Sequence, residues 1–285
     1  MQTKAYLPKT LTQLYDALKL MTPDSKIIGG GTDLAIRLRD CSCRPDALLY
    51  MGGVEGVRDI ALTPNGLEIG GMVTMTELAA SSHTVGYYAA LAHAAADVGA
   101  VQIRNSATVG GNLGNASPAG DLMPVWELLG AQVEIATPGG NLRRAHFAEV
   151  FLGPGKTGLN YNEAVVRFIV PPPASQTAKS AFVKLGSRKT LTISRIGLAG
   201  LLEVDGSGIV TRFQLVAGAI SPTPIHVTQA EEYLLGKRLA LDEAAKVGAL
   251  LSDLIMRVAR PANRNYKASG AYGVAEDLLA KLIAE

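Results

Sequence analysis

Two glycine-rich stretches hold the residues whose types and spacing could do chemistry. "IIGGGTD" occupies residues 27–33 and "TVGGN" occupies residues 108–112, and in each an apolar run leads into glycines and small polar residues. Glycine lacks the Cβ that would keep a ligand away from the backbone. Consecutive exposed amide N–H groups form a concave anion site, and a helix that begins directly after the first stretch adds its dipole. The pair of loops therefore predicts a site for a diphosphate.

Neither stretch matches a common nucleotide fingerprint. Residues 29–31 lack the G-x-G-x-x-G spacing, and no G-x-x-x-x-G-K-[ST] motif occurs. Tight turns between strands and helices would use the same glycines. Asp121, which follows the second loop, could accept hydrogen bonds from two ribose hydroxyls or could cap a helix over residues 122–129. Both roles remain open for Asp121, and they are compatible with each other.

The elements that must position these loops are a mixture of helices and strands. Apolar spacing predicts a helix in residues 10–20, and Asn65-Gly66 predicts a hairpin turn. The run of prolines in "PPPASQTAK", residues 171–179, predicts a linker. We expect a domain over residues 1–172, with subdomains at about 1–55 and 56–172, and a second domain over 178–285. In the second domain three strands, within 180–187, 193–204 and 209–220, precede helices at 226–235, 242–258 and 268–284, which is an α+β pattern.

Composition excludes several classes of function. The chain has 285 residues, a net charge of +2 and 48% hydrophobic residues, so nucleic acid is a poor candidate for a partner. The sequence contains no apolar run long enough to predict a membrane span. Its two cysteines, Cys41 and Cys43, favour a reducing, cytoplasmic location. Two cysteines alone cannot ligate an iron–sulfur cluster. The four histidines have no metal-ligand spacing, so no metal site is predicted. No nucleophile motif occurs either, so a cofactor must supply the chemistry.

"IIGGGTDL" and "ATVGGNLGNASPAGDLMPVWELLGAQV" resemble the FAD-binding medium subunit of the molybdenum hydroxylases. This family includes xanthine dehydrogenase, carbon monoxide dehydrogenase and 4-hydroxybenzoyl-CoA reductase. The resemblance covers the whole chain and includes "SAFVKLGSRKTLTIS". It implies an α+β fold with a two-part FAD-binding domain of the vanillyl-alcohol-oxidase/MurB-like type. A small α+β C-terminal domain of the CO dehydrogenase flavoprotein type, with a three-stranded sheet plus helices, would follow.

The resemblance also implies a set of FAD-binding residues. Backbone amides of the first loop would hold the diphosphate, residues of the second loop would contact the diphosphate or nearby flavin atoms, and Asp121 would hold a ribose hydroxyl. Lys184 aligns with a lysine near the flavin ring, where a cation would stabilise the negative charge of reduced flavin. The alternative for Lys184 is a solvated lysine at a strand edge. Asn115 stands where relatives often have Thr or another small residue. The full set is Ile28, Gly29, Gly30, Gly31, Thr32, Asp33, Thr108, Gly111, Asn112, Asn115, Asp121 and Lys184.

The implied function is electron transfer in a multi-subunit oxidoreductase. Electrons would arrive from a small [2Fe-2S] subunit, and an external acceptor such as NAD would accept them. A large molybdopterin subunit would hold the substrate. The basic residues Arg257, Arg260, Arg264 and Lys267 could face such a partner or form a solvated helix surface. Two other functions remain open: a self-contained flavin oxidoreductase of the same FAD-binding superfamily, and an assembly subunit that has lost the flavin.

Overall fold

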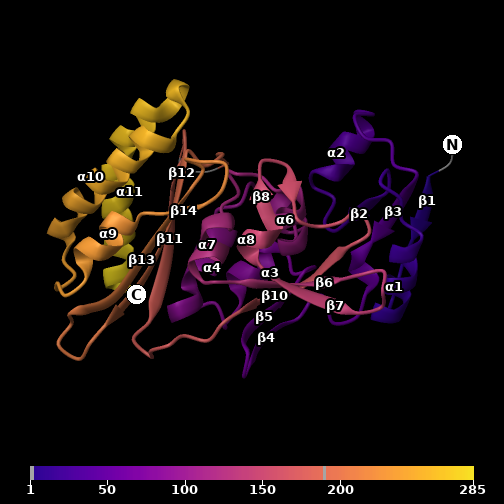
Figure 1. The fold of residues 1–285 in the computed structure, drawn as a ribbon, viewed down its shortest axis with the longest axis horizontal. Helices are drawn as coiled ribbons and strands as arrows, with labels where there is room; N and C mark the ends of the chain where they lie inside the picture. The colour runs from indigo at the N-terminus through magenta and orange to yellow at the C-terminus, as the bar shows by residue number, and fades with distance from the viewer. Residues whose placement is uncertain (1–2, 189–190) are drawn as a thin grey trace. The chain divides into compact units, whose positions relative to one another are not determined.

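The computed structural model describes residues 3–188 and 191–285, which form two compact units (Figure 1). Unit 1 comprises the residues up to Glu77, Val101–Ser117 and Gly130–Pro171. Unit 2 comprises Leu78–Ala100, Pro118–Leu129 and Pro172–Glu285. Two segments that precede the proline run thus group with the C-terminal part of the chain. The domain limits predicted from the sequence, 1–172 and 178–285, stay predictions.

Unit 1 begins with a small parallel sheet that carries the first glycine loop at its edge. Its strands pair in the order β1-β3-β2 and span β1 Lys4–Tyr6, β2 Lys26–Ile28 and β3 Ala47–Tyr50. Helix α1, Leu11–Lys19, connects β1 to β2; the Thr10 side chain caps it, and Leu14 and Leu18 bury its apolar face. Helix α2, Leu34–Arg39, follows the glycine loop directly, and η1 spans Met51–Gly53.

A larger antiparallel sheet completes the framework of unit 1. Its strand order is β4-β5-β10-β6-β7, with β4 Ile60–Thr63, β5 Gly66–Gly70, β6 Gln132–Ala136, β7 Leu142–His146 and β10 Ala164–Val170. The predicted β4–β5 hairpin is present, but its turn is Pro64-Asn65 and not Asn65-Gly66, because Gly66, at a φ of +114°, already pairs with Thr63. The remaining elements are α3 Met75–Ala80, whose last residues lie in unit 2, α5 Val101–Arg104, α6 Val109–Asn115, α8 Phe147–Val150, β8 Phe151–Gly153 and β9 Lys156–Thr157.

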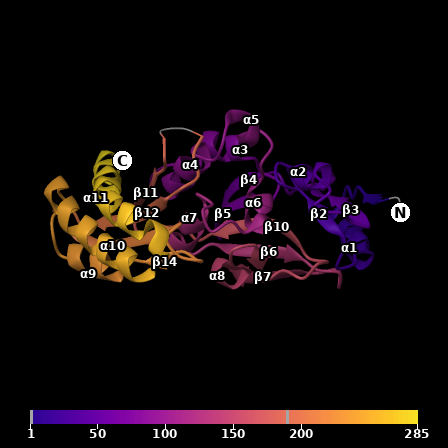
Figure 2. The ribbon, with the colours of Figure 1, turned by 90° about the horizontal axis from the view of Figure 1, so that it is seen from above.

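Unit 2 is an antiparallel sheet with helices on both faces. The strands are β11 Lys179–Leu185, β12 Ile196–Val204, β13 Val210–Gly218 and β14 Ile225–His226, in that order. Figures 1 and 2 show α9 Thr228–Leu234, α10 Ala244–Val258 and α11 Pro261–Ala284 together beside this sheet. Helices α4 Ala89–Ala96 and α7 Met123–Leu128 contact the sheet as well, and the short helices η2 Gly86–Tyr88 and η3 Leu241–Glu243 complete the unit.

Glycines in the central strands show why the sheet of unit 2 is covered twice. A Cβ on Gly197 or Gly218 would lie within 4 Å of Pro124 of α7, whereas a Cβ on Gly200 would meet Leu278 of α11. Gly197 and Gly200 have opposite parity on one strand, so α7 and α11 pack on opposite faces. Nearly every residue of β12 is buried, as expected for a strand covered on both sides.

The fold corrects three predictions about the C-terminal part. The sheet has four strands where three were expected, because Ile225–His226 pairs with β13. The helix predicted from residue 226 begins at Thr228, since His226 belongs to that fourth strand. The last helix begins at Pro261 and not at residue 268, and proline at the first helical position is compatible with a helix start.

Candidate flavin-binding site

The two glycine loops lie against each other within unit 1. A Cβ built on Gly29 would lie 2.7 Å from Thr108 Oγ1, and one built on Gly30 would lie 1.6 Å from the carbonyl oxygen of Ser106. The backbone of the first loop is therefore in direct contact with the segment that leads into the second. Gly31 has a φ of +72°, a left-handed conformation that glycine adopts without strain. These three glycines bring the loops together and turn the chain into α2.

The second loop forms the N-terminus of helix α6. Thr108 is its N-cap, and the Thr108 hydroxyl accepts a hydrogen bond from the amide of Gly111. Position 110 requires glycine, because a Cβ there would lie 2.7 Å from the carbonyl oxygen of Gly71. Asn115 is the last residue of α6, and Ala116, at a φ of +48°, ends the helix. Glycines here again permit close backbone packing.

Several polar groups at the loops have no hydrogen-bond partner in the part of the chain that the structure describes. Among the hydrogen bonds of residues 3–188 and 191–285, none has an amide N–H of residues 30–33 as its donor. Asn112 Oδ1 is buried and, within the same described residues, accepts no hydrogen bond. Residues 30–33 are half-buried or exposed, so their amides are accessible to a ligand. A buried polar atom is normally satisfied, so the Asn112 oxygen indicates a ligand. Free amides suit a diphosphate, and the Asn112 oxygen suits a hydroxyl or N–H donor, so the residues present fit FAD.

Asp121 and Lys184, the remaining predicted residues, belong to unit 2 and form a buried ion pair. Lys184 Nζ lies 2.9 Å from Asp121 Oδ2, and the two side chains are 7% and 8% exposed. Lys184 also donates to the carbonyl oxygen of Asp97, which ends α4, and the negative end of a helix dipole favours a cation there. The Ser194 hydroxyl donates to the other carboxylate oxygen of Asp121.

The ion pair decides two alternatives that the sequence left open. Asp121 makes no side-chain cap, because α7 begins after Leu122 and has no side-chain hydrogen bond at its N-terminus. Lys184 is buried and paired, so it is not a solvated lysine at a strand edge. Burial raises the pKa of Asp121, and the neighbouring Lys184 and Ser194 oppose that rise.

The twelve predicted residues therefore fall into two sets, one in each unit. Ten of them lie in the two glycine loops of unit 1, namely residues 28–33, Thr108, Gly111, Asn112 and Asn115, while Asp121 and Lys184 form the ion pair of unit 2. Sequence reasoning missed Ser194 and Asp97. Ser194 ends the "SAFVKLGSRKTLTIS" stretch and could have been noticed there. Asp97 acts through its backbone carbonyl, which no residue type signals.

No metal site, disulfide or membrane-spanning helix is found in the described part of the chain. No group of three or more His, Cys, Asp or Glu side chains there could hold a metal ion. Cys41 and Cys43 are free thiols. None of the helices in residues 3–188 and 191–285 combines the length and the apolar character that crossing a membrane requires.

Comparisons with known proteins agree with the geometry of the loops. The family described as "FAD binding domain in molybdopterin dehydrogenase" matches residues 1–173, and "CO dehydrogenase flavoprotein C-terminal domain" matches residues 181–282. The nicotinate dehydrogenase FAD-subunit of Eubacterium barkeri is 33% identical over 98% of this chain and 95% of its own length. The xanthine dehydrogenase FAD-binding subunit of Escherichia coli O157:H7 is 31% identical over 89% and 88%.

A solved structure has the same fold. Carbon monoxide dehydrogenase from Hydrogenophaga pseudoflava superposes with a TM-score of 0.86 at 24% identity, covering 100% of this chain and 98% of the other. The predicted family, the two-part α+β fold class and the cofactor FAD are thereby confirmed. The chain belongs to the FAD-binding flavoprotein subunits of the molybdopterin dehydrogenases, oxidoreductases that include the xanthine and nicotinate dehydrogenases.

Proposed function

We propose that this FAD subunit relays electrons inside a molybdenum hydroxylase complex, from a [2Fe-2S] subunit to an external acceptor such as NAD. The observation that carries the proposal is the pair of contacting glycine loops with free amides and an unsatisfied Asn112 oxygen. Such loops suit a dinucleotide, and the cofactor would supply the redox chemistry. FAD, when bound, accepts electrons singly and passes on a pair as hydride.

The residues of the chain would then bind and orient the cofactor. Amides of Gly29–Asp33, at the end of the strand that closes with Ile28, would hold the diphosphate, and Thr108, Gly111, Asn112 and Asn115 would contact it from the second loop. The ion pair places Asp121 and Lys184 at one point, whereas the adenosine ribose and the flavin ring are opposite ends of FAD, so we assign both residues to the flavin end, where Asp121 and Ser194 would hold Lys184 in place. Lys184 would place its ammonium near the flavin ring and so favour the reduced, negatively charged form.

The proposed function also requires partner subunits that carry an iron–sulfur cluster and molybdopterin. Its two cysteines cannot hold an iron–sulfur cluster, which needs about four thiolates, so the one-electron relay would lie on a separate small subunit. A separate large subunit would hold the molybdopterin and the substrate. The names of two relatives, "FAD-subunit" and "FAD-binding subunit", support a division of the enzyme among chains.

The flavin reduction potential tests the proposal. Lys184→Met should lower the two-electron potential by about 30–60 mV, since 30 mV corresponds to roughly 1.4 kcal/mol for such a couple. Lys179→Met, at the other end of β11, is the matched control and should leave the potential unchanged. Spectroelectrochemical titration of the purified flavoprotein measures both. Equal potentials in the two variants would contradict the role of Lys184.

Absorbance and co-purification separate the alternative functions. A colourless protein that assembles normally would support an assembly subunit without flavin. A yellow protein that purifies alone and oxidises a substrate by itself would support a self-contained flavin oxidoreductase. Co-purification with an iron–sulfur chain and a molybdopterin chain is the result that our proposal expects.

A further inference from the structure

Positive charge is concentrated where α10 meets α11. Residues 254–275 contain Arg257, Arg260, Arg264 and Lys267 and no Asp or Glu. The whole chain has a net charge of +2, so the remaining residues carry a net charge of −2. Arg195, at the start of β12, lies close enough to Lys267 to act on its charge. We call these five residues the basic corner.

The basic corner contains a buried ammonium without a counter-charge. Lys267 is 8% exposed, and its Nζ donates to the carbonyl oxygen of Ala219 at 2.5 Å. Burial, together with Arg195 and Arg260, lowers the pKa of Lys267. No ion pair among the described residues includes any of the five cations of the corner. Buried charges are normally paired, so this arrangement lacks an anion.

The helix dipole adds to the positive potential. Arg260 is the N-cap of α11, a helix of 24 residues, and its first turn contains no acidic residue. The N-terminus of a helix is its positive end, where cations are unfavourable and anions are favoured. A negatively charged group from outside the chain would therefore relieve the electrostatic repulsion between these cations and the N-terminus of α11.

The surface around these cations has the composition of a protein interface. Met256 and Tyr266, which flank Arg257, Arg260 and Arg264 in the sequence, are 42% and 53% exposed. Arginine, tyrosine and methionine are enriched in interface cores, where aromatic and Arg side chains contribute most of the binding energy. The Arg264 guanidinium donates to the carbonyl oxygen of Met256 and thereby links α10 to α11 at the corner.

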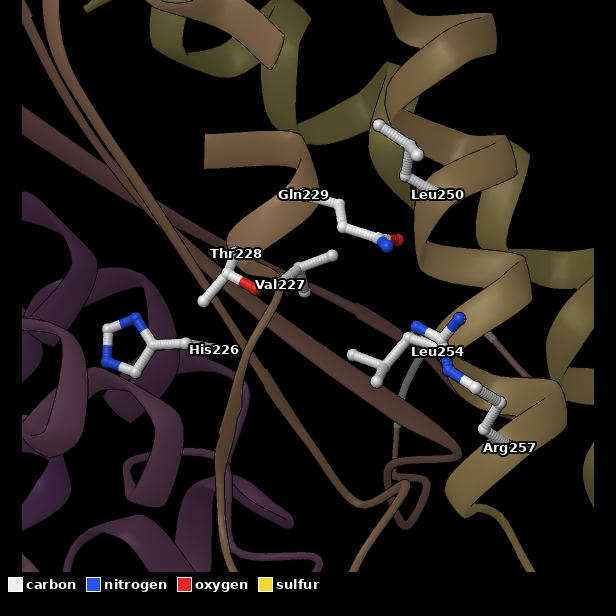
Figure 3. Close-up of a pocket in the computed structure, with 7 residues that line it drawn as sticks. All are labelled: His226, Val227, Thr228, Gln229, Leu250, Leu254 and Arg257. Carbon is white, nitrogen blue, oxygen red and sulfur yellow. The ribbon is translucent and has the colours of Figure 1, made fainter. Parts of the chain in front are cut away.

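A small recess adjoins the basic corner and could receive a side chain. It has a volume of about 90 Å³, and Leu250 and Leu254 of α10 contribute its apolar lining. Figure 3 shows the side chains of Gln229 and Arg257 pointing toward each other beside these leucines. An apolar lining with a guanidinium and an amide at its side suits an acidic side chain with an aliphatic stem.

We propose that the basic corner is the docking surface for a carboxylate-rich face of a partner subunit, an inference that rests on the proposed function. Carboxylates of the partner pair with the arginines, and one of them supplies the missing counter-charge of Lys267. A second copy of this chain is the wrong occupant, because a symmetric contact would place these cations against themselves. The exposed Met256 and Tyr266 and the recess favour a protein over a phosphate backbone.

Charge reversal in the co-expressed complex tests the surface. Arg257→Glu combined with Arg260→Glu should weaken retention of the partner at least tenfold at low salt and flatten its dependence on salt. Arg37→Glu combined with Arg44→Glu, which changes charge equally on unit 1, is the matched control and should assemble like the parent. Size-exclusion chromatography across a salt series measures assembly. Flavin absorbance and the unfolding midpoint of the full chain measure integrity.

Lys267→Met separates docking from a structural role. If Lys267 awaits a partner carboxylate, the variant should keep or raise the unfolding midpoint of the full chain while assembly weakens. A lower midpoint with normal assembly would overturn the proposal, because Lys267 would then only tie α11 to Ala219.

Three further results would also overturn the docking proposal. The first is normal assembly of the double Glu variant at every salt concentration. The second is salt-dependent binding of a 20-base-pair DNA duplex by the basic corner, and the third is a flavin-loaded parent chain that purifies without any protein partner. A parent chain without flavin would instead count against the proposed function, while the assembly result would still decide the docking surface.

Discussion

The ammonium of Lys184 on β11 lies 2.9 Å from the carboxylate of Asp121, 63 residues earlier in the chain. Four segments of unit 2 hold this pair in place: the end of α4 through Asp97, the segment before α7 through Asp121, strand β11, and the connection to β12 through Ser194. Because both groups are buried, each depends on the other for its charge. The same ion pair therefore stabilises unit 2 and fixes the position of the Lys184 ammonium, the cation that we assign to the flavin.

Coupling within this pair can be measured by a double-mutant cycle. Lys184→Met and Asp121→Leu alone should each lower the free energy of unfolding by about 3–5 kcal/mol, because each leaves an unpaired buried charge. The double variant should be much more stable than the sum of the single effects predicts. Urea unfolding of the full chain gives the three differences. Simple additivity would show that the two charges do not interact.

The contact between the glycine loops predicts a sharp difference between two glycines. Gly30→Ala would place a methyl group 1.6 Å from the Ser106 carbonyl oxygen, so the loops must separate. We expect at least about a tenfold loss of FAD affinity, equivalent to roughly 1.4 kcal/mol. Gly114→Ala in α6, where a Cβ meets no atom within 4 Å, is the control and should bind FAD like the parent. Flavin fluorescence titration of the two apoproteins measures both affinities, and equal affinities would remove the loop contact from the site.

Sequence reasoning succeeded where a residue type has one strong physical meaning. Consecutive glycines predicted a backbone that a ligand can approach, which stays a prediction, and in the structure Gly29 and Gly30 also admit the backbone that leads into the second loop. The strands predicted within 193–204 and 209–220 are confirmed as β12 and β13. Strand β14 was missed because Ile225–His226 is too short for any alternation to appear.

Contacts between distant segments could not be predicted from one sequence. Asp121 and Lys184 were each interpreted alone, one toward a ribose and one toward the flavin, because no local pattern shows that residues 63 apart meet. The same reason hid the packing of α4 and α7 on the C-terminal sheet. For Lys267 the sequence left open a partner-facing role and a solvated helix surface, and the structure buries this side chain. Tertiary context decides such features.

A ladder of alternating charges crosses the large sheet of unit 1. Glu134 on β6 pairs with Arg144 on β7 and with Arg167 on β10, and Arg167 also pairs with Glu68 on β5. Glu134→Gln should lower the free energy of unfolding by about 1–3 kcal/mol, because it leaves partly buried guanidinium groups without charge compensation. Asp16→Asn, which removes only the exposed pair with Lys19, should cost less than about 0.5 kcal/mol. Urea unfolding followed by circular dichroism compares them, and equal costs would mean that the ladder adds nothing.

His93 should make unit 2 sensitive to acid. Its Nε2 lies 3.1 Å from a carboxylate oxygen of Glu285, and Nδ1 is buried without a partner among the described residues. Burial, with a smaller effect of Lys281, lowers the pKa of His93 to about 4. The unfolded chain takes up a proton near pH 6.5, whereas the folded chain resists it until about pH 4. Stability from this group is therefore complete above pH 6.5 and is lost as the pH falls toward 4.

The loss has an upper limit of about 3 kcal/mol, at 1.36 kcal/mol for each unit of pKa difference. His93→Gln keeps a donor for Glu285 but cannot take up the proton, so its unfolding free energy should fall less than that of the parent between pH 6.5 and 4. His83→Gln, at an exposed position, is the control and should follow the parent. Other carboxylates titrate in all three proteins, so the difference between the two variants isolates His93. If both variants lose stability in parallel with the parent, the buried imidazole does not titrate in this range.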